Sequence, residues 1–354
     1  AWRISNTIIT ISCILLAFIT IPILIWTKEV SHFIAPGFSD AQVVQMIGFT
    51  RFMVLAQVFP LLIGNFFTGI LQSHNLFTIP GVAPVVYNIG IIISIIIFSS
   101  SMGLWAPVVG VGIGAVLFMC IQIPSLVQLG YRHRMALDIH NQGVREIGKL
   151  MVPRTIGLAI SQVDTTVDLI LSTLLGARMV TVFNFAQHLQ QLPIGLFGAT
   201  VAQAAFPLLA QASAHEDKDK FAKTLYSALN QIVFFIMPVS VLFMVLRIPI
   251  VRLVFGASRF DWQATVLTGM TLSMFAISLS AQAVSQLLTR GFYALYDTKT
   301  PVIIGVITIL INTICSVVFV QFYKFPVWSL GLSTSIASII NVTLLVLYLG
   351  RKIG

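Results

Sequence analysis

Charged residues are scarce in this chain. Asp, Glu, Lys and Arg make up 9% of the 354 residues, whereas hydrophobic residues make up 57% and the mean hydropathy is +0.97. A soluble domain carries roughly 25% charged residues, so this composition excludes a soluble globular protein. Runs of about 20 apolar residues recur along the whole length. The sequence therefore predicts an all-α, polytopic membrane protein.

Cysteine and the common catalytic motifs are also scarce or missing. The three cysteines, Cys13, Cys120 and Cys315, all fall inside apolar runs, so neither a disulfide framework nor a cysteine-ligated metal site is supported. No HExxH, CxxC, GxSxG or phosphate-binding-loop pattern occurs. The loops also lack paired carboxylates beside a basic cluster, which a transferase would need. We therefore expect no enzyme activity and no resident metal.

The chain has a net charge of +9, from 20 Lys and Arg residues against 11 Asp and Glu residues. A basic chain can bind nucleic acid, but here the basic residues lie in loops between apolar runs. This bias is typical of membrane topology, and it places the long basic loop 130–152 in the cytoplasm. We expect no nucleic-acid partner. The second half of that loop is predicted to lie on the membrane surface as an amphipathic helix before Pro153.

A pattern in the first half of the chain recurs in the second half. An apolar helix opens at Gly110 in the sequence GVGIGA, and another opens at Gly331 in GLSTSI. A polar turn and a proline start the helix before each, at Pro80 and at Pro301. Two membrane halves of the same topology are typical of transporters that bind substrate between them. The first copy is two spans shorter, so we interpret the chain as a fragment and expect two further spans before Ala1.

Ten membrane spans are predicted from the apolar runs. Residues 1–150 would form an N-terminal lobe with four spans of an incomplete six-helix repeat and a basic linker. Residues 151–354 would form a C-terminal lobe with a complete six-helix repeat, and the lobes would surround a central cavity. The predicted spans are residues 5–26, 46–72, 81–99, 104–128, 154–175, 179–209, 222–246, 263–289, 302–322 and 328–350.

Two carboxylates lie inside one of these apolar runs. Asp164 and Asp168 are separated by four residues, which puts both on one face of the predicted helix 154–175. Ionisable groups near the middle of a bilayer are costly and mark ion or proton pathways. The alternative is a structural pair that is capped by polar side chains of neighbouring helices.

Small polar residues on two later spans are candidate partners of these acids. They are Asn312 and Ser316 on one span, and Ser333, Thr334 and Ser335 on the next. Oxygen ligands near Asp168 would suit a hard monovalent cation. Small polar residues also mediate packing between membrane helices, so both interpretations stay open.

A dense polar cluster lies inside the span predicted at 179–209. It consists of Gln187, His188, Gln190 and Gln191. Such a cluster must face protein or water, so we predict that it lines a cavity in which His188 contacts an anionic headgroup. Hydrogen bonding between helices is the alternative. Pro193 predicts a kink directly after the cluster, and with Gly195 it forms a candidate hinge.

Arg51 lies near the outer end of the predicted span 46–72. It is a candidate cavity residue, because a cationic group there could attract an anionic substrate. The alternative is that its long side chain reaches back to the membrane surface.

Several short segments resemble the MurJ (MviN) family of lipid II flippases, which belongs to the multidrug/oligosaccharidyl-lipid/polysaccharide (MOP) exporter superfamily. The segments are Ala35-Pro-Gly-Phe38, Phe77-Thr-Ile-Pro-Gly-Val-Ala-Pro84, Leu192-Pro-Ile-Gly195 and, most specifically, Gly291-Phe-Tyr-Ala-Leu-Tyr-Asp-Thr-Lys-Thr-Pro301. The resemblance implies a flippase of the bacterial inner membrane with two six-helix lobes around a cationic cavity. It also implies that the chain begins at the family's third helix and stops after its twelfth.

The resemblance implies a substrate and roles for single residues. The substrate would be lipid II or a related undecaprenyl-linked lipid, moved outward by a monomer among membrane lipids. His188 stands where the family usually has an arginine, and histidine is the poorer partner for pyrophosphate. Some members bind sodium through an acid that Asp168 matches, while Ser316 stands where those sites have a second acid. No cofactor is implied, and Na+, H+ or the membrane potential would drive transport.

Other functions stay open at this point. The nearest is another exporter of the same superfamily, either a polysaccharide-repeat flippase or a drug/cation antiporter. A membrane-embedded glycosyl or phosphoryl transferase is a second alternative, although it would need loop carboxylates and usually a divalent metal. A third is a non-transporting scaffold that has lost its cavity charges.

Overall fold

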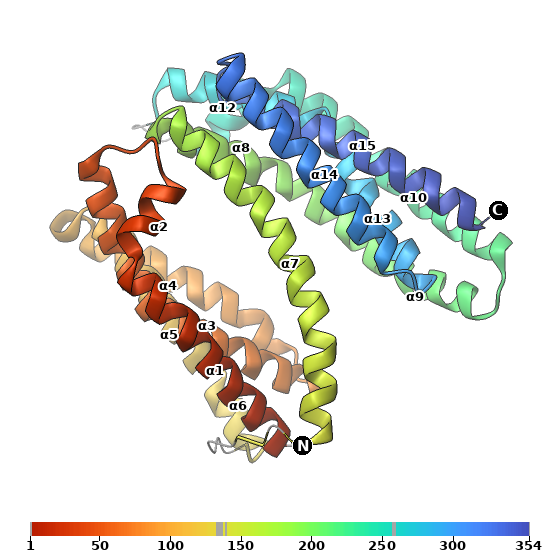
Figure 1. Ribbon diagram of the computed structural model, residues 1–354, viewed down its shortest axis with the longest axis horizontal. Coiled ribbons are helices and arrows are strands. Elements are labelled where there is room, and N and C mark those ends of the chain that lie inside the picture. Colours follow the sequence, from red (N-terminus) through yellow and green to blue (C-terminus); the bar gives the residue numbers. More distant parts are fainter. Residues whose placement is uncertain (1, 132–136, 139, 257–259, 354) are drawn as a thin grey trace. The chain divides into compact units, whose positions relative to one another are not determined.

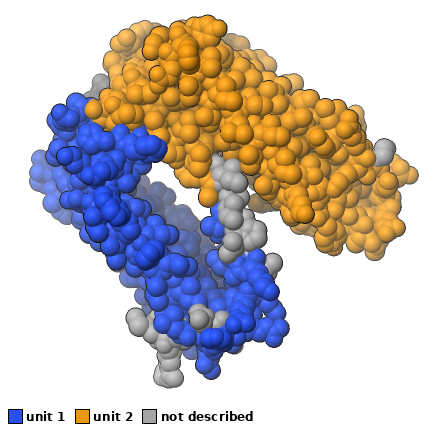
Figure 2. Space-filling view, viewed as in Figure 1, with its two compact units in different colours: residues 1–34, 39–155 blue, residues 35–38, 156–354 orange. Residues whose placement is uncertain are grey.

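A computed structural model describes residues 2–131, 137–138, 140–256 and 260–353 of the chain (Figure 1). Over these residues the secondary structure consists of α-helices and two short π-helical segments, without any strand. The chain divides into two compact units (Figure 2), unit 1 with residues 1–34 and 39–155 and unit 2 with residues 35–38 and 156–354. The all-α architecture predicted from composition is confirmed.

The number of apolar helices differs slightly from the ten predicted spans. In the described part of the chain, eight helices are long and apolar enough to cross a membrane, or nine if α12 (Trp262–Ala276) and α13 (Leu279–Ala294) form one bent span. The predicted span 154–175 is not among them. It lies in α7 (Gln142–Leu174), where the two aspartates lower the hydropathy of the helix.

Helix α7 also corrects a second expectation. It begins at Gln142 and runs without a break to Leu174, so the surface helix predicted before Pro153 is not a separate element. It is the first part of the same helix as the predicted span. Residues 132–136 and 139 of the predicted basic loop lie outside the described residues.

Unit 1 contains the first part of α7 and six further helices. These are α1 (Trp2–Ile25), α2 (Thr27–Ile34), α3 (Asp40–Ser73), α4 (Thr78–Met102), α5 (Trp105–Cys120) and α6 (Ile123–Gln128). The repeated glycines of the GVGIGA segment lie on α5, where Gly110 and Gly114 face α4 and Gly112 faces α3. A Cβ atom on Gly110 would lie 2.8 Å from Ser94 Cβ, and one on Gly114 would lie 2.5 Å from the Tyr87 carbonyl oxygen. The motif is therefore a close-packed seam of the kind that small residues form between membrane helices.

The break between α5 and α6 is stabilised by Gln122, which is fully buried. Its Nε2 donates to the carbonyl oxygens of Gly64, at 3.1 Å, and Phe118, at 2.9 Å. Its Oε1 accepts a hydrogen bond of 2.9 Å from Thr68 Oγ1. Both amide hydrogens and the oxygen are thus used, so this buried polar group is satisfied within unit 1.

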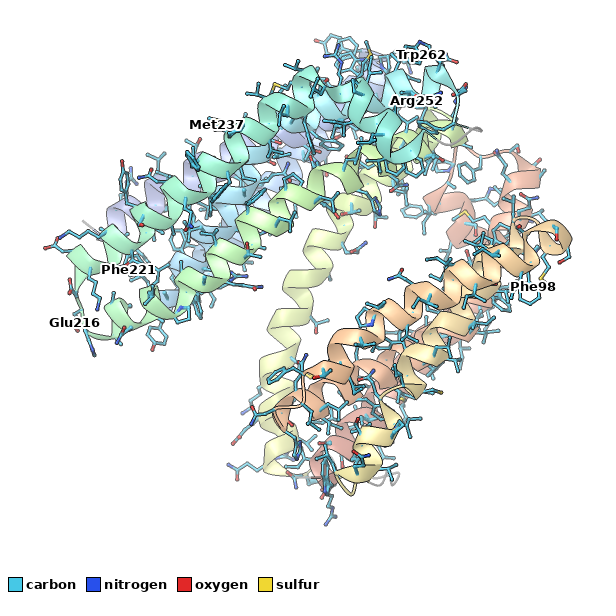
Figure 3. The ribbon with its side chains drawn as sticks, turned by 180° about the vertical axis from the view of Figure 1, so that it is seen from behind. Phe98, Glu216, Phe221, Met237, Arg252 and Trp262 are labelled. Atoms are coloured by element: carbon cyan, nitrogen blue, oxygen red, sulfur yellow. The ribbon has the colours of Figure 1, made fainter. Side chains whose placement is uncertain are left out.

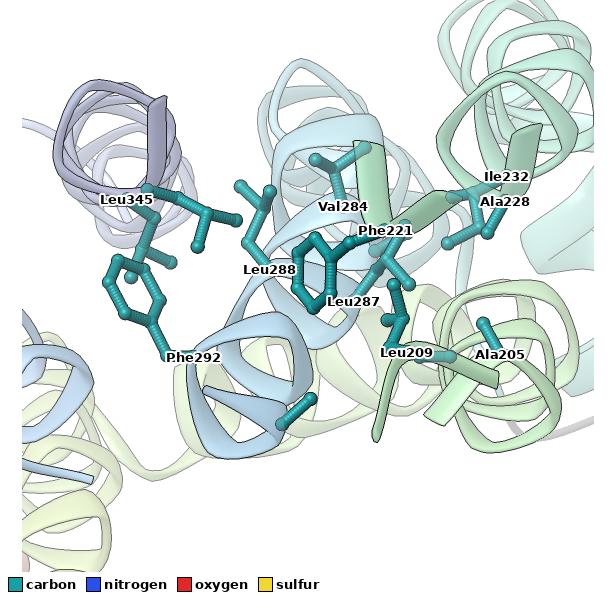
Figure 4. Packing of buried hydrophobic residues seen from close by; sticks show 14 of the residues in the cluster. Ala205, Leu209, Phe221, Ala228, Ile232, Val284, Leu287, Leu288, Phe292 and Leu345 are labelled. Carbon is teal, nitrogen blue, oxygen red and sulfur yellow. The ribbon is translucent and has the colours of Figure 1, made fainter. Parts of the chain in front are cut away.

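Unit 2 contains the rest of α7 and eight further α-helices, with two π-helical segments. They are α8 (Ala177–Pro193), η1 (Ile194–Ala199), α9 (Thr200–Ala214), α10 (Lys218–Val245), α11 (Arg247–Phe255), α12, α13, α14 (Lys299–Val317), η2 (Val318–Phe322) and α15 (Trp328–Ile353). A large apolar cluster joins α9, α10, α13 and α15, with Leu209, Phe221, Leu288 and Leu345 among its buried members (Figure 4). Other large side chains face outward, such as Met237, 52% exposed, and Trp262, 64% exposed (Figure 3), as lipid-facing helices require.

The turn between α13 and α14 is held by Asp297, which belongs to the most specific segment of the family resemblance. Its Oδ1 accepts hydrogen bonds from the backbone N–H groups of Lys299 and Thr300, at 3.1 and 3.0 Å. Lys352, near the end of α15, forms an ion pair with it. Burial alone would raise the pKa of Asp297, but the hydrogen bonds from Lys352 and Thr300 outweigh it and hold the pKa well below its usual range. This contact joins the start of α14 to the end of α15.

Candidate functional site

Unit 2 holds a buried polar network around Asp168 of α7, which is 4% exposed. Asp168 Oδ1 accepts from Ser316 Oγ at 3.0 Å, and Oδ2 accepts from Asn312 Nδ2 at 3.2 Å. Asn312 Nδ2 also donates to Asp164 Oδ1 at 2.9 Å. Each helix contributes two residues one turn apart, so α7 and α14 meet along a polar stripe. The structure thus brings together four of the residues predicted for a cation site.

The network continues to α15 through Ser333. Ser333 Oγ lies 2.6 Å from Ser316 Oγ and 2.9 Å from the carbonyl oxygen of Leu330 in its own helix. Thr334, another candidate partner on this helix, donates to the same Leu330 oxygen at 2.9 Å. Of the three candidates on α15, Ser333 therefore links this helix to the network, through Ser316 rather than through an acid.

This network is short of positive charge. The ion pairs found among the described residues involve neither Asp164 nor Asp168. Buried carboxylates without a counter-charge are costly in a membrane. In addition, Asn312 Oδ1 is buried without a hydrogen-bond partner. Two carboxylates, an unused amide oxygen and hydroxyl groups, whose hydrogen-bond partners among the described residues include no His or Cys, suit an alkali cation better than a transition metal.

The polar cluster on α8 is divided between a buried and an exposed side. Gln190 is 4% exposed, and its Nε2 donates to Gln282 Oε1 of α13 at 3.3 Å, while its Oε1 has no partner. His188 and Gln191 are exposed and Gln187 is half-buried. The last three lie on or near the surface of unit 2, and their contact with a headgroup stays a prediction.

The imidazole of His188 already uses one of its nitrogens. Nδ1 lies 2.7 Å from the carbonyl oxygen of Asn184, one turn earlier on α8. Because a carbonyl only accepts, Nδ1 must carry a hydrogen. Nε2 is then an acceptor in the neutral ring and a donor only in the imidazolium.

The candidate hinge on α8 coincides with a change of helix type. Directly after Pro193 the chain forms the π-helical segment η1. Such segments interrupt the regular hydrogen-bond ladder and cluster at functional sites. Gly195 is exposed, and no atom lies within 4 Å of the place that its Cβ would take. The hinge function itself stays a prediction.

Arg51 belongs to unit 1, on α3. Its side chain is exposed, and its Nε donates to Thr27 Oγ1 at 3.3 Å. Thr27 is buried at the start of α2. The contact joins α2 to α3 within unit 1, and a role for Arg51 toward substrate stays a prediction.

A second polar network, which the sequence analysis did not single out, lies at the break between α12 and α13. The two helices are bent by 45° there. The N–H of Ser278 donates to the Phe275 carbonyl oxygen at 3.1 Å rather than to Met274 four residues earlier. Ser335 Oγ of α15 donates to the Met274 oxygen at 2.6 Å, and Gln282 Nε2 donates to Ser278 Oγ at 2.9 Å. Side chains thus replace backbone bonds that the break removes.

One sequence signal could have indicated this break. Ser278 and Gln282 are four residues apart inside an apolar run, which is the same pattern that singled out Asp164 and Asp168. Without charge, however, such a pair is not distinguishable from ordinary helix contacts.

Comparison with known proteins gives consistent matches. The family model described as lipid II flippase MurJ matches residues 2–354. A probable lipid II flippase MurJ of Vibrio cholerae is 27% identical over 281 residues, which cover 78% of this chain and 53% of that protein. The lipid II flippase MurJ of Burkholderia cenocepacia is 25% identical over 295 residues, which cover 80% of this chain and 56% of that protein. The chain therefore spans about half the length of these relatives.

Solved structures share the fold. The structure titled lipid II flippase MurJ, inward closed conformation, superimposes with a TM-score of 0.86 at 23% identity, over 99% of this chain and 72% of that chain. An inward-facing multidrug resistance MATE family transporter of the MOP superfamily gives a TM-score of 0.84 at 15% identity, over 100% of this chain and 81% of that chain. Since the family model matches nearly every residue, this chain belongs to the lipid II flippase MurJ family.

Proposed function

We propose that this chain acts as a lipid II flippase of the bacterial inner membrane. It moves undecaprenyl-pyrophosphate-linked muropeptide from the cytoplasmic to the outer leaflet by alternating access. The observation that carries this proposal is the family match over residues 2–354. Residues 1–150 and 151–354 act as the two lobes, and the lipid tail stays in the bilayer while the headgroup passes between them.

The headgroup is bound by His188, Gln187 and Gln191 of α8, with Arg51 of α3. Glutamine amides can donate to sugar hydroxyls and to phosphate oxygens. His188 reaches the pyrophosphate through Nε2, because its Nδ1 hydrogen is directed at the Asn184 carbonyl. Pro193 and Gly195 allow α8 to bend about η1 as the lobes move.

A monovalent cation bound at Asp168 couples to transport. Asp168 and Asp164 would supply negative charge, Ser316 a hydroxyl oxygen, and Asn312 its unpaired Oδ1 after the amide turns over. The cation would offset the buried negative charge and so favour one packing of α7 against α14. Supporting this assignment, the described contacts of both carboxylates include no basic side chain.

The test is lipid II translocation by the purified protein in proteoliposomes, combined with rescue of a cell depleted of its own flippase. We expect fluorescent lipid II to reach the opposite leaflet in a protein-dependent way and the cell to survive. Failure of both translocation and rescue by a folded protein would contradict the proposal.

A second candidate function is a different exporter of the MOP superfamily. The fold matches a MATE transporter almost as well as a MurJ structure, with TM-scores of 0.84 and 0.86. The same proteoliposomes distinguish the two. Export of a cationic drug or of a polysaccharide-linked lipid, without movement of lipid II, would favour the second candidate.

A further inference from the structure

We infer that α15 couples cation occupancy at Asp168 to the break between α12 and α13. Ser333 contacts the network around Asp168 and Ser335 contacts the break, and we call this coupling through α15 the relay. The inference rests on the proposed function, because it requires a cation at Asp168. It assigns a role to two serines that contact different networks although they are two positions apart on one helix. All of the residues concerned belong to unit 2.

If the short contact of 2.6 Å between Ser316 Oγ and Ser333 Oγ stays a hydrogen bond, the two hydroxyl hydrogens can be placed in two ways. Ser316 Oγ contacts Asp168 Oδ1 and Ser333 Oγ, and Ser333 Oγ also contacts the Leu330 oxygen, so two hydroxyl hydrogens serve three contacts. If the carboxylate has no cation, Ser316 donates to Asp168 and Ser333 donates to Ser316. The Leu330 oxygen then receives nothing from Ser333.

A bound cation reverses the direction of this chain. A cation at the carboxylate attracts the lone pairs of Ser316 Oγ and repels its hydrogen, which turns toward Ser333. Ser333 must then donate to the Leu330 oxygen, the contact that is 2.9 Å long. Cation occupancy is thereby converted into a hydrogen bond within the first turn of α15, a two-state element of the kind that coupling between sites requires.

The first turn of α15 is packed closely against α12. Leu330 is fully buried, and a Cβ on Gly331 would lie 3.0 Å from the Thr271 carbonyl oxygen. A displacement of this turn therefore cannot be absorbed by empty space and must move the neighbouring helix.

Ser335 connects α15 to the break itself. Two residues correspond to about 200° around an α-helix, so Ser335 points away from Ser333. Ser335 donates to the Met274 oxygen at 2.6 Å and lies 2.9 Å from Ser278 Oγ. From Ser278 the hydrogen bonds continue through Gln282 to Gln190 of α8.

The last member of this chain can change partners. Gln190 Oε1 is buried and has no hydrogen-bond partner, so a shift of α13 breaks no bond of that oxygen. The helix that carries Gln190 also carries His188 and Gln191 on its exposed side. The chain of contacts therefore runs from the acidic network to the helix that we propose binds the headgroup.

The test is hydrogen exchange of the backbone amides around 271–285, measured on the full chain in sodium and in potassium. Sodium should slow exchange at the break by about fivefold or more. Ser333→Ala should keep sodium affinity within about threefold, because Ser333 is not among the proposed ligands of the cation. The same variant should lose the sodium-dependent slowing of exchange at the break. Ser333→Thr, which keeps a hydroxyl, should restore it. Ser335→Ala should also bind sodium without slowing exchange.

Thr343→Ala is the matched control. Its hydroxyl lies on the same helix, and its hydrogen bond in the described chain is to the Ile339 oxygen of that helix, at 2.7 Å, so the sodium response should be unchanged. Thermal unfolding verifies that each variant is folded. A full sodium response in Ser333→Ala or in Ser335→Ala, or sodium binding without any response in the unmodified protein, overturns the relay. Absence of sodium binding overturns both the relay and the proposed coupling site, while lipid II translocation is judged separately.

Discussion

The two units treat buried polar groups differently. In unit 1, Gln122 has a partner for both amide hydrogens and for its oxygen. Within the described chain, the buried side-chain atoms without a partner all belong to unit 2, namely Gln190 Oε1, Thr268 Oγ1, Asn312 Oδ1 and Ser329 Oγ. Satisfied networks fix one packing, whereas unsatisfied ones tend to occur at functional sites. In the described chain, unused hydrogen-bonding capacity is therefore concentrated in unit 2, the unit that holds the acidic network.

Helix contacts show the same difference. The α4–α5 contact of unit 1 depends on glycines that leave no room for a side chain. The contacts of α7, α14 and α15 in unit 2 depend on hydroxyl, amide and carboxylate groups. A glycine seam has one arrangement, but hydroxyl groups can exchange donors and acceptors without moving backbone.

The largest expected effect is on transport when the charge in unit 2 is removed. Asp168→Asn should lower cation-dependent lipid II translocation by about 5- to 150-fold, the usual range for coupling between two sites. Thermal stability should be unchanged or higher, since a buried carboxylate is lost. The measurement is proteoliposome flux over a range of sodium concentrations and membrane potentials. Unchanged flux under every condition would remove Asp168 from the mechanism.

A pair of equivalent substitutions tests the comparison directly. Gln122→Leu should lower the free energy of unfolding by about 1–3 kcal/mol, because Thr68 and two carbonyl oxygens lose their partner. Gln190→Leu should cost less, since only the bond to Gln282 is lost. Thermal unfolding in one detergent gives both values. Equal losses in the free energy of unfolding would show that the unpaired oxygen of Gln190 does not reduce what this residue contributes to stability.

The glycine seam should be intolerant of even one methyl group. Gly114→Ala places its Cβ 2.5 Å from the Tyr87 oxygen, so helix α5 must move and stability should fall by about 1–3 kcal/mol. Gly81→Ala on α4 is the matched control, because nothing lies within 4 Å of its Cβ position. Both variants are compared by their melting temperatures, and a neutral Gly114→Ala would mean that the seam can separate at little cost.

The smallest effect concerns acid stability of unit 2. The pKa of Asp297 is lowered in the folded state, so its contribution is complete above the unfolded pKa of about 4 and is lost as pH falls through the folded pKa. Melting temperature should therefore fall more steeply below pH 4 in the unmodified protein than in Asp297→Asn. Parallel curves would show that the ion pair with Lys352 does not contribute to stability.

The sequence predicted the parts of this molecule that depend on composition and charge. The apolar runs gave helices, and the pairing of Asp164 with Asn312 and of Asp168 with Ser316 follows from charge that apolar helices must bury. Ser333 was not distinguished from Thr334, because helix rotation decides which hydroxyl faces Ser316. The break at Ser278 was predicted as continuous helix, since neutral polar residues in an apolar run do not reveal whether they bond to side chains or to freed backbone.

The contact between Asp297 and Lys352 has a mechanical consequence. Helices α14 and α15 are joined covalently near one end by residues 323–327 and at the other end by this ion pair. Two antiparallel helices that are linked at both ends form a closed frame. Neither end of the pair can separate freely, but the frame can still rotate as one rigid body. Ser316 and Ser333 face each other inside that frame, so the distance between them should persist through the transport cycle while the frame tilts against α7.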